Sequence, residues 1–142
     1  MTQVDFYVLE TPGHGDRLQL CCRLAEKAWS QGHRILVHCA SAEEAQRLDR
    51  LLWVFRDQSF VPHGRLGEVD PGLTPVLIAH AGESGDEHDV LINLAPDVPV
   101  FFSRFERVAE PVDAEPPARA ASRERFRFYR DRGYEPTVHR LG

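Results

Sequence analysis

The sequence predicts a three-layer α/β/α fold with a mostly parallel, twisted sheet, and three observations carry that prediction. Short, continuous apolar runs such as residues 75–79 and 89–94 are typical of strands that are covered on both faces. Other segments place apolar residues three or four positions apart, which is the pattern of an amphipathic helix. In the first half of the chain the two kinds of segment alternate, as they do when helices cross between parallel strands.

The size and composition of the chain fit one such domain. Its 142 residues, of which 42% are hydrophobic, are enough to bury a core. No repeat, low-complexity tract or boundary divides the sequence, so we expect a single domain over residues 1–142. No segment approaches the roughly 20 apolar residues of a membrane span, and no signal sequence is recognisable, which predicts a cytoplasmic protein.

The first strand and the first helix are predicted near the N-terminus. Residues 4–9 form an apolar and aromatic run, and the glycines and proline of residues 11–15 predict a turn after it. Asp16 is a suitable N-cap for a helix that should end near Gly32. The apolar stripe of this helix consists of Leu18, Cys21, Cys22, Ala25 and Trp29. With the third cysteine at position 39, the cysteines form no metal-binding or disulfide pattern, so we expect buried thiols.

A second strand and helix follow directly. Residues 34–39 predict the strand. Ser41 and Glu44 have the S-x-x-E spacing of a capping box, in which each side chain accepts a hydrogen bond from a backbone N–H at the start of the helix. This helix should run to about Phe55. Its apolar stripe consists of Ala45, Leu48, Leu51, Leu52 and Phe55.

The second half of the chain supplies the remaining elements. Residues 75–79 and 89–94 predict two strands, and residues 105–112 predict a further one. A last helix should begin after the two prolines at 116–117 and end near Gly133, because proline is tolerated at a helix start and glycine favours its exit.

Motifs for catalysis or cofactor binding are absent from the places where this Rossmann-like layout would carry them. The turn at 11–15 is neither G-x-G-x-x-G nor a phosphate-binding loop, and the chain contains only one lysine. We therefore expect no cofactor, no metal and no catalytic residue. The seven histidines lack metal-ligand spacing, and the best residual cluster is His80, His88 and Asp89. A small metal-assisted or nucleotide-binding α/β enzyme that uses this cluster is the alternative.

The charge of the chain is unevenly distributed. The whole chain carries a net charge of -5, but residues 119–142 contain seven arginines against three acidic residues, a net charge of +4. The first 118 residues therefore carry -9. A basic segment on an acidic body predicts a localised anion-binding site rather than a general nucleic-acid surface.

The last helix places most of these arginines on one face. Arg119, Arg123, Phe126 and Arg130 fall within a band about 60° wide, with Arg127 at its side. We expect Phe128 and Ala121 to face the sheet, with Tyr129 on the flank and Phe126 pointing outward. Guanidinium groups bind carboxylates in forked geometry, so this face favours a peptide with acidic side chains and a terminal carboxylate. A plain solvated surface is one alternative, and single-stranded nucleic acid, disfavoured by the acidic body, is another.

The second helix carries one aromatic residue outside its apolar stripe. Trp53 lies about 100° beyond Leu52 around the helix, and residues 60–64 follow in a predicted loop. This arrangement favours an apolar docking patch, since exposed aromatic clusters usually mark partners. The alternative is that Trp53 and Phe60 fold back over one edge of the core.

Several segments resemble the chi subunit of bacterial DNA polymerase III, and together they span nearly the whole chain. They are residues 4–9, 47–53, 59–63, 89–94 and 123–134. The Leu-Trp pair at 52–53 followed by Ser-Phe-Val-Pro-His at 59–63 is the most specific part. The resemblance implies a non-catalytic adaptor of the clamp-loader complex in DNA replication. It also implies two partners, the psi subunit and the acidic, phenylalanine-ending C-terminal tail of single-stranded-DNA-binding protein, with only an indirect association with DNA.

The resemblance also assigns these partners to residues. Trp53 and Phe60, with Val61 and Pro62 beside them, fall where the family contacts psi. Arg119, Arg123, Phe126 and Arg130, with Arg127 beside them, fall where the family holds the acidic tail. Position 126 is phenylalanine where the better-known members have tyrosine, and position 119 is arginine rather than lysine. The last five residues, 138–142, also differ from the family.

Overall fold

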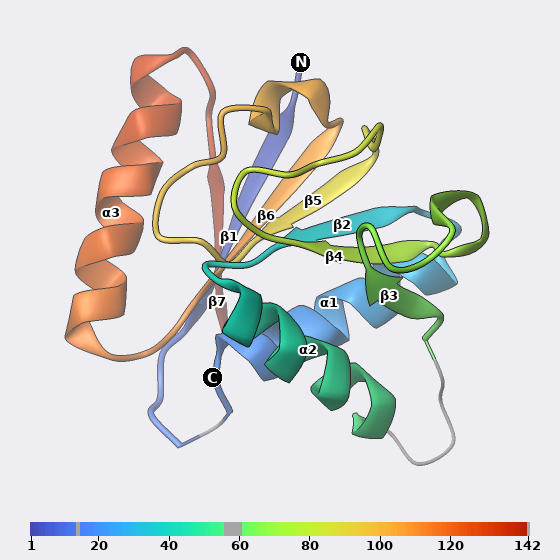
Figure 1. Ribbon diagram of the computed structural model, residues 1–142. Coiled ribbons are helices and arrows are strands. Elements are labelled where there is room, and N and C mark those ends of the chain that lie inside the picture. The colour runs from blue at the N-terminus through green and yellow to red at the C-terminus, as the bar shows by residue number, and fades with distance from the viewer. Residues whose placement is uncertain (14, 56–60, 142) are drawn as a thin grey trace.

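The computed structural model describes residues 1–13, 15–55 and 61–141, and in these residues it has a twisted seven-stranded sheet with helices on both faces (Figure 1). Every strand pair in this part of the chain is parallel, and the strand order is β3-β4-β2-β5-β6-β1-β7. The strands are β1 (Gln3–Leu9), β2 (Ile35–His38), β3 (His63–Arg65), β4 (Val76–Ala79), β5 (Val90–Asn93), β6 (Arg107–Val112) and β7 (Thr137–Leu141). The prediction of a three-layer α/β/α fold with a mostly parallel sheet is confirmed.

The helices occupy opposite faces because the chain leaves the sheet in two directions. Helix α1 (Arg17–Ser30) connects β1 to β2 toward one edge, and α2 (Ala42–Val54) continues from β2 to β3 in the same direction. Helix α3 (Pro116–Asp131) connects β6 to β7 toward the other edge. Crossovers between parallel strands are right-handed, so opposite directions put α3 on the face opposite α1 and α2. Figure 1 shows α3 alone on its side of the sheet.

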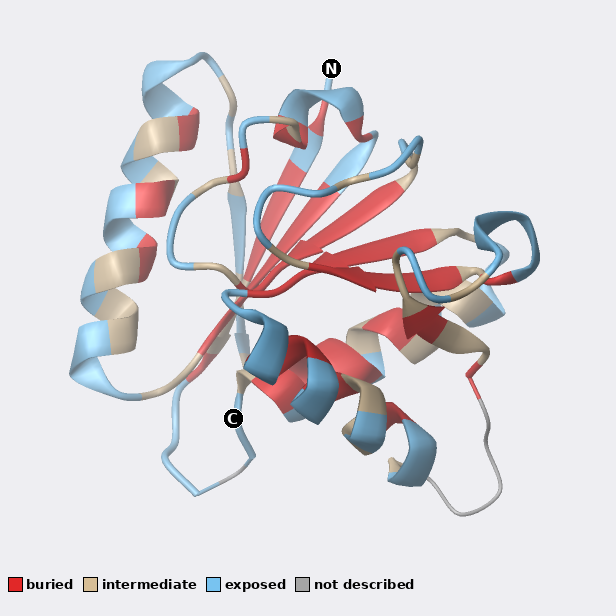
Figure 2. Cartoon of the chain, in the orientation of Figure 1, coloured by how far each residue is buried: buried red, intermediate tan, exposed pale blue. Residues whose placement is uncertain are grey.

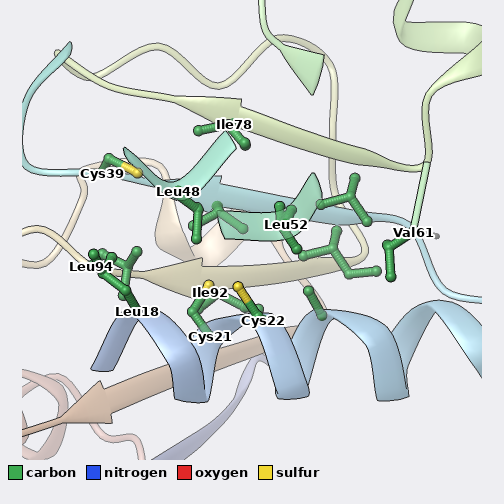
Figure 3. Close-up of a cluster of buried hydrophobic side chains, with 14 of the residues drawn as sticks. Leu18, Cys21, Cys22, Cys39, Leu48, Leu52, Val61, Ile78, Ile92 and Leu94 are labelled. Carbon is green, nitrogen blue, oxygen red and sulfur yellow. The ribbon is translucent and has the colours of Figure 1, made fainter. Parts of the chain in front are cut away.

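The core beneath α1 and α2 contains alternate residues of the central strands. Ile92 of β5 lies in the same cluster as Leu48 and Leu52 of α2 (Figure 3). The three cysteines belong to this cluster and are buried free thiols, as predicted. Burial raises the pKa of Cys22 and of Cys39 to about 12.

The core beneath α3 is built from the opposite side of the same strands. Phe6 of β1 and Val108 of β6 pack against Tyr129 of α3. Phe102 and Phe105, from the segment between β5 and β6, belong to the same cluster as the central strands on this face. Figure 2 shows that the buried residues of α3 lie on its side toward the sheet.

Both predicted N-caps are confirmed. The Asp16 carboxylate accepts a hydrogen bond from the Gln19 N–H at 3.0 Å, and the Ser41 hydroxyl accepts from the Glu44 N–H at 3.1 Å. The other half of the predicted capping box differs. One oxygen of Glu44 accepts from the N–H of Ala40, one residue before the cap, at 2.9 Å, and the other forms an ion pair with Arg17.

Two strands were not predicted from the sequence. Residues 63–65 form β3 where a loop was expected, and residues 137–141 form β7, for which no element was predicted. Both are edge strands, each paired with one neighbour, so they lack the continuous apolar run of a central strand. Within the described ranges, no helix has the length and apolar character needed to cross a membrane.

Candidate partner-binding surfaces

A buried polar network fixes the rotation of α3 on the sheet. The carboxylate of Glu110, from the middle of β6, is fully buried. It accepts hydrogen bonds from Arg125 Nε at 2.9 Å, Tyr129 Oη at 2.7 Å and Asn93 Nδ2 at 3.0 Å. Burial raises the pKa of Glu110, and the Arg125 charge and these three donors oppose the rise. The network turns Arg125 and Tyr129 inward, so the remaining arginines of α3 face outward.

The outward orientation predicted for Phe126 is therefore wrong in part, and the flank position predicted for Tyr129 is wrong. Tyr129 is fully buried. Phe126 is half-buried and packs on Phe6 of β1, with 5.4 Å between the ring centroids. One edge of Phe126 thus belongs to the core, and the rest of its ring forms part of the surface between the arginines.

The arginines of this face differ in how far the protein itself satisfies them. Arg123, Arg127 and Arg130 are exposed, and only Arg127 has an acidic partner in the described part of the chain, Glu124 at 3.3 Å on the same solvent-facing turn. Arg119 is half-buried, and its terminal nitrogen donates to the carbonyls of Leu9 and Glu10, each at 3.2 Å. Its Nε is buried and has no hydrogen-bond partner among the described residues. The face therefore offers guanidinium groups that are not neutralised by internal acids.

A cleft lies beside these arginines, between α3 and the edge of the sheet. Its volume is about 190 Å³. Arg119, Arg123 and Phe126 line it from α3, and Phe6 and Val8 line it from β1. The structure thus brings three of the five residues predicted for acidic-tail binding into one cleft. Arg127 and Arg130 line an adjoining, more open hollow that also contains Arg123 and Phe126.

The surface around Trp53 lies at the far end of α2. The Trp53 side chain is 59% exposed, and its ring meets His63 edge-on with 5.2 Å between centroids. His63 is held in turn by the Val61 carbonyl at 2.7 Å and by Asp49 at 3.0 Å. Trp53 is therefore a positioned aromatic side chain, and its exposure fits the docking patch better than complete folding back over the core.

The other three residues predicted for psi binding have different positions. Val61 is 1% exposed and belongs to the core under α2, so its side chain supports the patch from below. Pro62 is half-buried. Phe60 lies outside the described residues. Among the described residues, Trp53 and Pro62 are thus the ones that present surface.

The histidine cluster considered for an enzyme does not come together. Asp89 lies 3.1 Å from the Nδ1 of His33 and accepts a hydrogen bond from the Arg34 N–H at 2.9 Å. His80 lies instead near His38, whose pKa is lowered first by burial and then by the His80 charge. In the ranges that the structure describes, no three His, Cys, Asp or Glu residues form a group that could hold a metal ion.

Sequence comparison identifies close relatives over almost the full length of the chain. The family model described as "DNA polymerase III chi subunit, HolC" matches residues 1–137. The DNA polymerase III subunit chi of Pseudomonas aeruginosa is 47% identical over 141 residues, which cover 99% of this chain and 98% of the relative. That of Escherichia coli is 35% identical over 139 residues, covering 94% and 95%. That of Haemophilus influenzae is 30% identical over 125 residues, covering 87% of each.

Proposed function

This chain belongs to the family of DNA polymerase III chi subunits, and we propose that it acts as an adaptor that joins the clamp loader to single-stranded-DNA-binding protein. As a chi subunit it is a non-catalytic accessory component of the polymerase and takes part in DNA replication. The proposal concerns its two contacts: the psi subunit at the Trp53 surface, and the acidic C-terminal tail of single-stranded-DNA-binding protein at the arginine face of α3.

The observation that carries tail binding is the set of arginines around Phe126 that have no internal acidic partner. Arg123 and Arg130 are exposed, and the side chain of neither forms an ion pair or hydrogen bond with the described residues. An acidic tail would supply the missing carboxylates, and charge-assisted hydrogen bonds to carboxylates are among the stronger polar contacts. The adjoining cleft supplies the apolar contact that a phenylalanine at the end of the tail requires.

Single-stranded DNA is a weaker candidate for the same face. Stacking on Phe126 and phosphate contacts to arginine would suit a nucleotide. However, Phe126 has one edge packed on Phe6, and the first 118 residues carry a net charge of -9. A nucleic-acid strand longer than α3 would run into this negative body, whereas a short peptide would remain on the helix.

A single site of this size should bind its peptide with a dissociation constant on the order of micromolar, equivalent to about -8 kcal/mol. Single-stranded-DNA-binding protein coats its template in many copies, so many tails are present at high local concentration. Repeated weak contacts then hold the complex near the template without a new strong interface.

The tail proposal is tested by titrating a labelled acidic peptide that ends in Asp-Phe against the wild type, Arg123→Ala and Arg47→Ala. Arg47 is exposed on α2, so the last variant removes the same charge from a different helix. Saturable micromolar binding that Arg123→Ala abolishes and Arg47→Ala leaves within about twofold supports tail capture. If the folded wild type does not bind the peptide, or if both variants weaken binding equally, tail capture at α3 is rejected.

The psi contact is supported by the exposure of Trp53 and by its packing on His63. Buried tryptophans at the centre of an interface often contribute more than 2 kcal/mol to binding. Trp53→Ala should therefore weaken binding of purified psi at least about thirtyfold. Tail binding should be unchanged, because Trp53 and α3 lie on opposite faces of the sheet. If the wild type and Trp53→Ala bind psi with equal affinity, Trp53 does not take part in the contact.

A further inference from the structure

A further cleft lies on the face of the sheet that α1 covers, away from both proposed partner surfaces. It is formed by the C-terminal half of α1 and by the amino ends of β5 and β6, whose first residues, Val90 and Arg107, line it. The arginine face of α3 is on the opposite side of the sheet, and Trp53 of α2 does not line the cleft. Neither proposed contact uses this part of the molecule.

The polar side chains that line this cleft can all donate hydrogen bonds, and none of them is acidic. They are Tyr7 of β1, Lys27 and Gln31 at the end of α1, His33 before β2, and Arg107 of β6. The exposed ammonium group of Lys27, the single lysine of the chain, has no ion pair or hydrogen bond to the described residues. Arg107 donates to the side-chain oxygen of Gln3 at 3.1 Å and has no acidic partner in the described ranges. The cleft thus presents two cations that internal acids do not pair.

Tyr7 adds a neutral donor to these cations. Its ring is half-buried and stacks on His139 with 4.7 Å between centroids. Its hydroxyl forms no hydrogen bond with the part of the chain that the structure describes. Burial raises the pKa of Tyr7, the charge of Asp5 adds to the rise, and the charge of Arg107 opposes it. The hydroxyl therefore keeps its proton at neutral pH and remains a donor.

Two carboxylates near the cleft are already engaged by histidines. Asp5 Oδ1 lies 2.9 Å from His139 Nε2, beside the stacked ring of Tyr7. Asp89 Oδ1 lies 3.1 Å from the Nδ1 of His33, which lines the cleft. Neither carboxylate forms an ion pair with a cation of the cleft in the described residues. The positive charge of the cleft is therefore left for a ligand.

The floor of the cleft is apolar and small. Its apolar lining consists of Leu24, Ala28, Val90, Ile92 and Ala109. The volume is about 110 Å³. Apolar cavities that hold a benzene ring measure about 150 Å³, so this cleft suits a short aliphatic group better than an aromatic ring. A phosphate group is polar on every side, and contact with this floor would bury its oxygens without hydrogen-bond partners.

We propose that this cleft binds a carboxylate carried on a short aliphatic stem. The stem lies on the apolar floor, and the carboxylate accepts hydrogen bonds from Lys27, Arg107 and Tyr7. A free short-chain organic acid and the glutamate side chain of another protein share this chemistry. The site is independent of the proposed function, because it uses no residue of the Trp53 surface or of the arginine face.

The test is a nuclear magnetic resonance titration of the isotope-labelled full chain with three probes. The probes are butyrate, its neutral analogue butyramide, and glutamate that is blocked at both backbone ends. The proteins are the wild type, Lys27→Gln, Arg107→Gln, Tyr7→Phe and Arg123→Ala, with Arg23→Gln as the matched control. Arg23 is exposed on the same helix as Lys27 and does not line the cleft, so its variant removes the same charge from a neighbouring position. Circular dichroism and thermal unfolding establish that each variant is folded.

The proposed site predicts where butyrate binds and which variants weaken its binding. Saturable shifts should be confined to the amides of residues 24–33 and 107–109, with a dissociation constant on the order of 1 mM. Lys27→Gln, Arg107→Gln and Tyr7→Phe should each weaken binding about fivefold. Arg23→Gln and Arg123→Ala should leave it within about twofold, and butyramide should bind at least about tenfold more weakly than butyrate.

The blocked glutamate distinguishes the two sources of the ligand. If it binds as tightly as butyrate, the cleft admits the side chain of a protein partner. If only butyrate binds, the ligand is a free acid, and in both cases the site stands.

Three results would overturn the proposal without affecting the proposed function. Shifts that map to α3 and disappear in Arg123→Ala would mean that butyrate binds the arginine face. Equal binding of butyramide and butyrate would show that the charge is not recognised. Absence of saturable shifts with either acid in the folded wild type would show that the cleft is not a carboxylate site.

Discussion

Replacing Arg125 with methionine should destabilise the fold, because it leaves the buried carboxylate of Glu110 beneath α3 without its cationic partner. Glu110 is completely buried, and its only cationic partner among the described residues is Arg125, 2.9 Å away and itself about 10% exposed. Removing one member of a buried ion pair costs about 3–5 kcal/mol, because the remaining charge is left uncompensated. Tyr129 and Asn93 still donate to the other oxygen of Glu110. We therefore expect Arg125→Met to lower the free energy of unfolding by about 3 kcal/mol near neutral pH.

The pH dependence of this loss tests its cause. Burial raises the pKa of Glu110 above its usual 4.5 and Arg125 opposes the rise, so loss of Arg125 raises the pKa further. Above pH 4.5 the folded protein then retains a proton that the unfolded chain has released, and stability falls as the pH rises through this window. The cost of Arg125→Met should therefore be about 1 kcal/mol near the lower end of the window, where Glu110 is neutral, and should grow toward about pH 7.

Denaturant-induced unfolding, followed by far-ultraviolet circular dichroism at several pH values, measures the effect. Arg123→Met is the matched control, because the same substitution two residues away removes an exposed arginine and should change stability by less than about 0.5 kcal/mol. The double variant Glu110→Gln and Arg125→Met should recover much of the stability at neutral pH. A loss that is independent of pH, or no larger than that of Arg123→Met, would refute the role assigned to this ion pair.

Three further predictions concern the capping, the thiols and the same network. Ser41→Ala removes the hydroxyl that accepts from the first turn of α2 and should lower the free energy of unfolding by about 1 kcal/mol, which urea titration would detect. Because burial raises the pKa of Cys22 and Cys39 to about 12, a thiol-specific reagent at about pH 8 should label them only after denaturation, and rapid labelling of the native protein would contradict this. Tyr129→Phe deletes a donor to Glu110 at 2.7 Å and should cost about 1–3 kcal/mol in thermal or denaturant unfolding, so an unchanged stability would show that the hydroxyl is dispensable.

The central strands and the helix starts were predictable because their signals are local. A strand that is buried on both faces must be apolar throughout, and residues 75–79 and 89–94 are. Asp16 and Ser41 act through backbone groups within their own first turn, so their spacing alone predicts the caps. The edge strand β7 gives no such signal, since one of its sides faces no neighbouring strand and most of its residues are exposed.

The orientation of α3 was harder to predict from the sequence, because a residue on another element determines it. Phe126 and Tyr129 are both aromatic, and the helical pattern alone allows either one to face the sheet. Glu110 decides between them by binding Tyr129 and Arg125. A signal was present in β6, where a glutamate interrupts the apolar run of residues 108–112, and a buried carboxylate requires donors from a neighbouring element. The sequence does not reveal which arginine supplies them.

The chain lacks a nucleotide-binding motif, and the N–H groups that would bind a phosphate in such an α/β fold are bonded to internal carboxylates. In such folds the N–H groups at the start of the first helix usually bind a phosphate. Here the N–H of Arg17, the first residue of α1, donates to the carboxylate of Asp113 at 2.7 Å. In the loop before α2, the Ala40 N–H likewise donates to an internal carboxylate, that of Glu44.

These internal carboxylates take the positions that a bound anion would occupy, and they place negative charge where a phosphate would have to approach. Asp113 also stabilises the scaffold, because it satisfies an N–H at the start of α1. The exposed arginines of α3, such as Arg123 and Arg130, lie away from this crevice, toward the edge of the sheet. The proposed anion-binding face therefore lies away from the crevice at the strand ends, on an outer face that a peptide from another protein could reach.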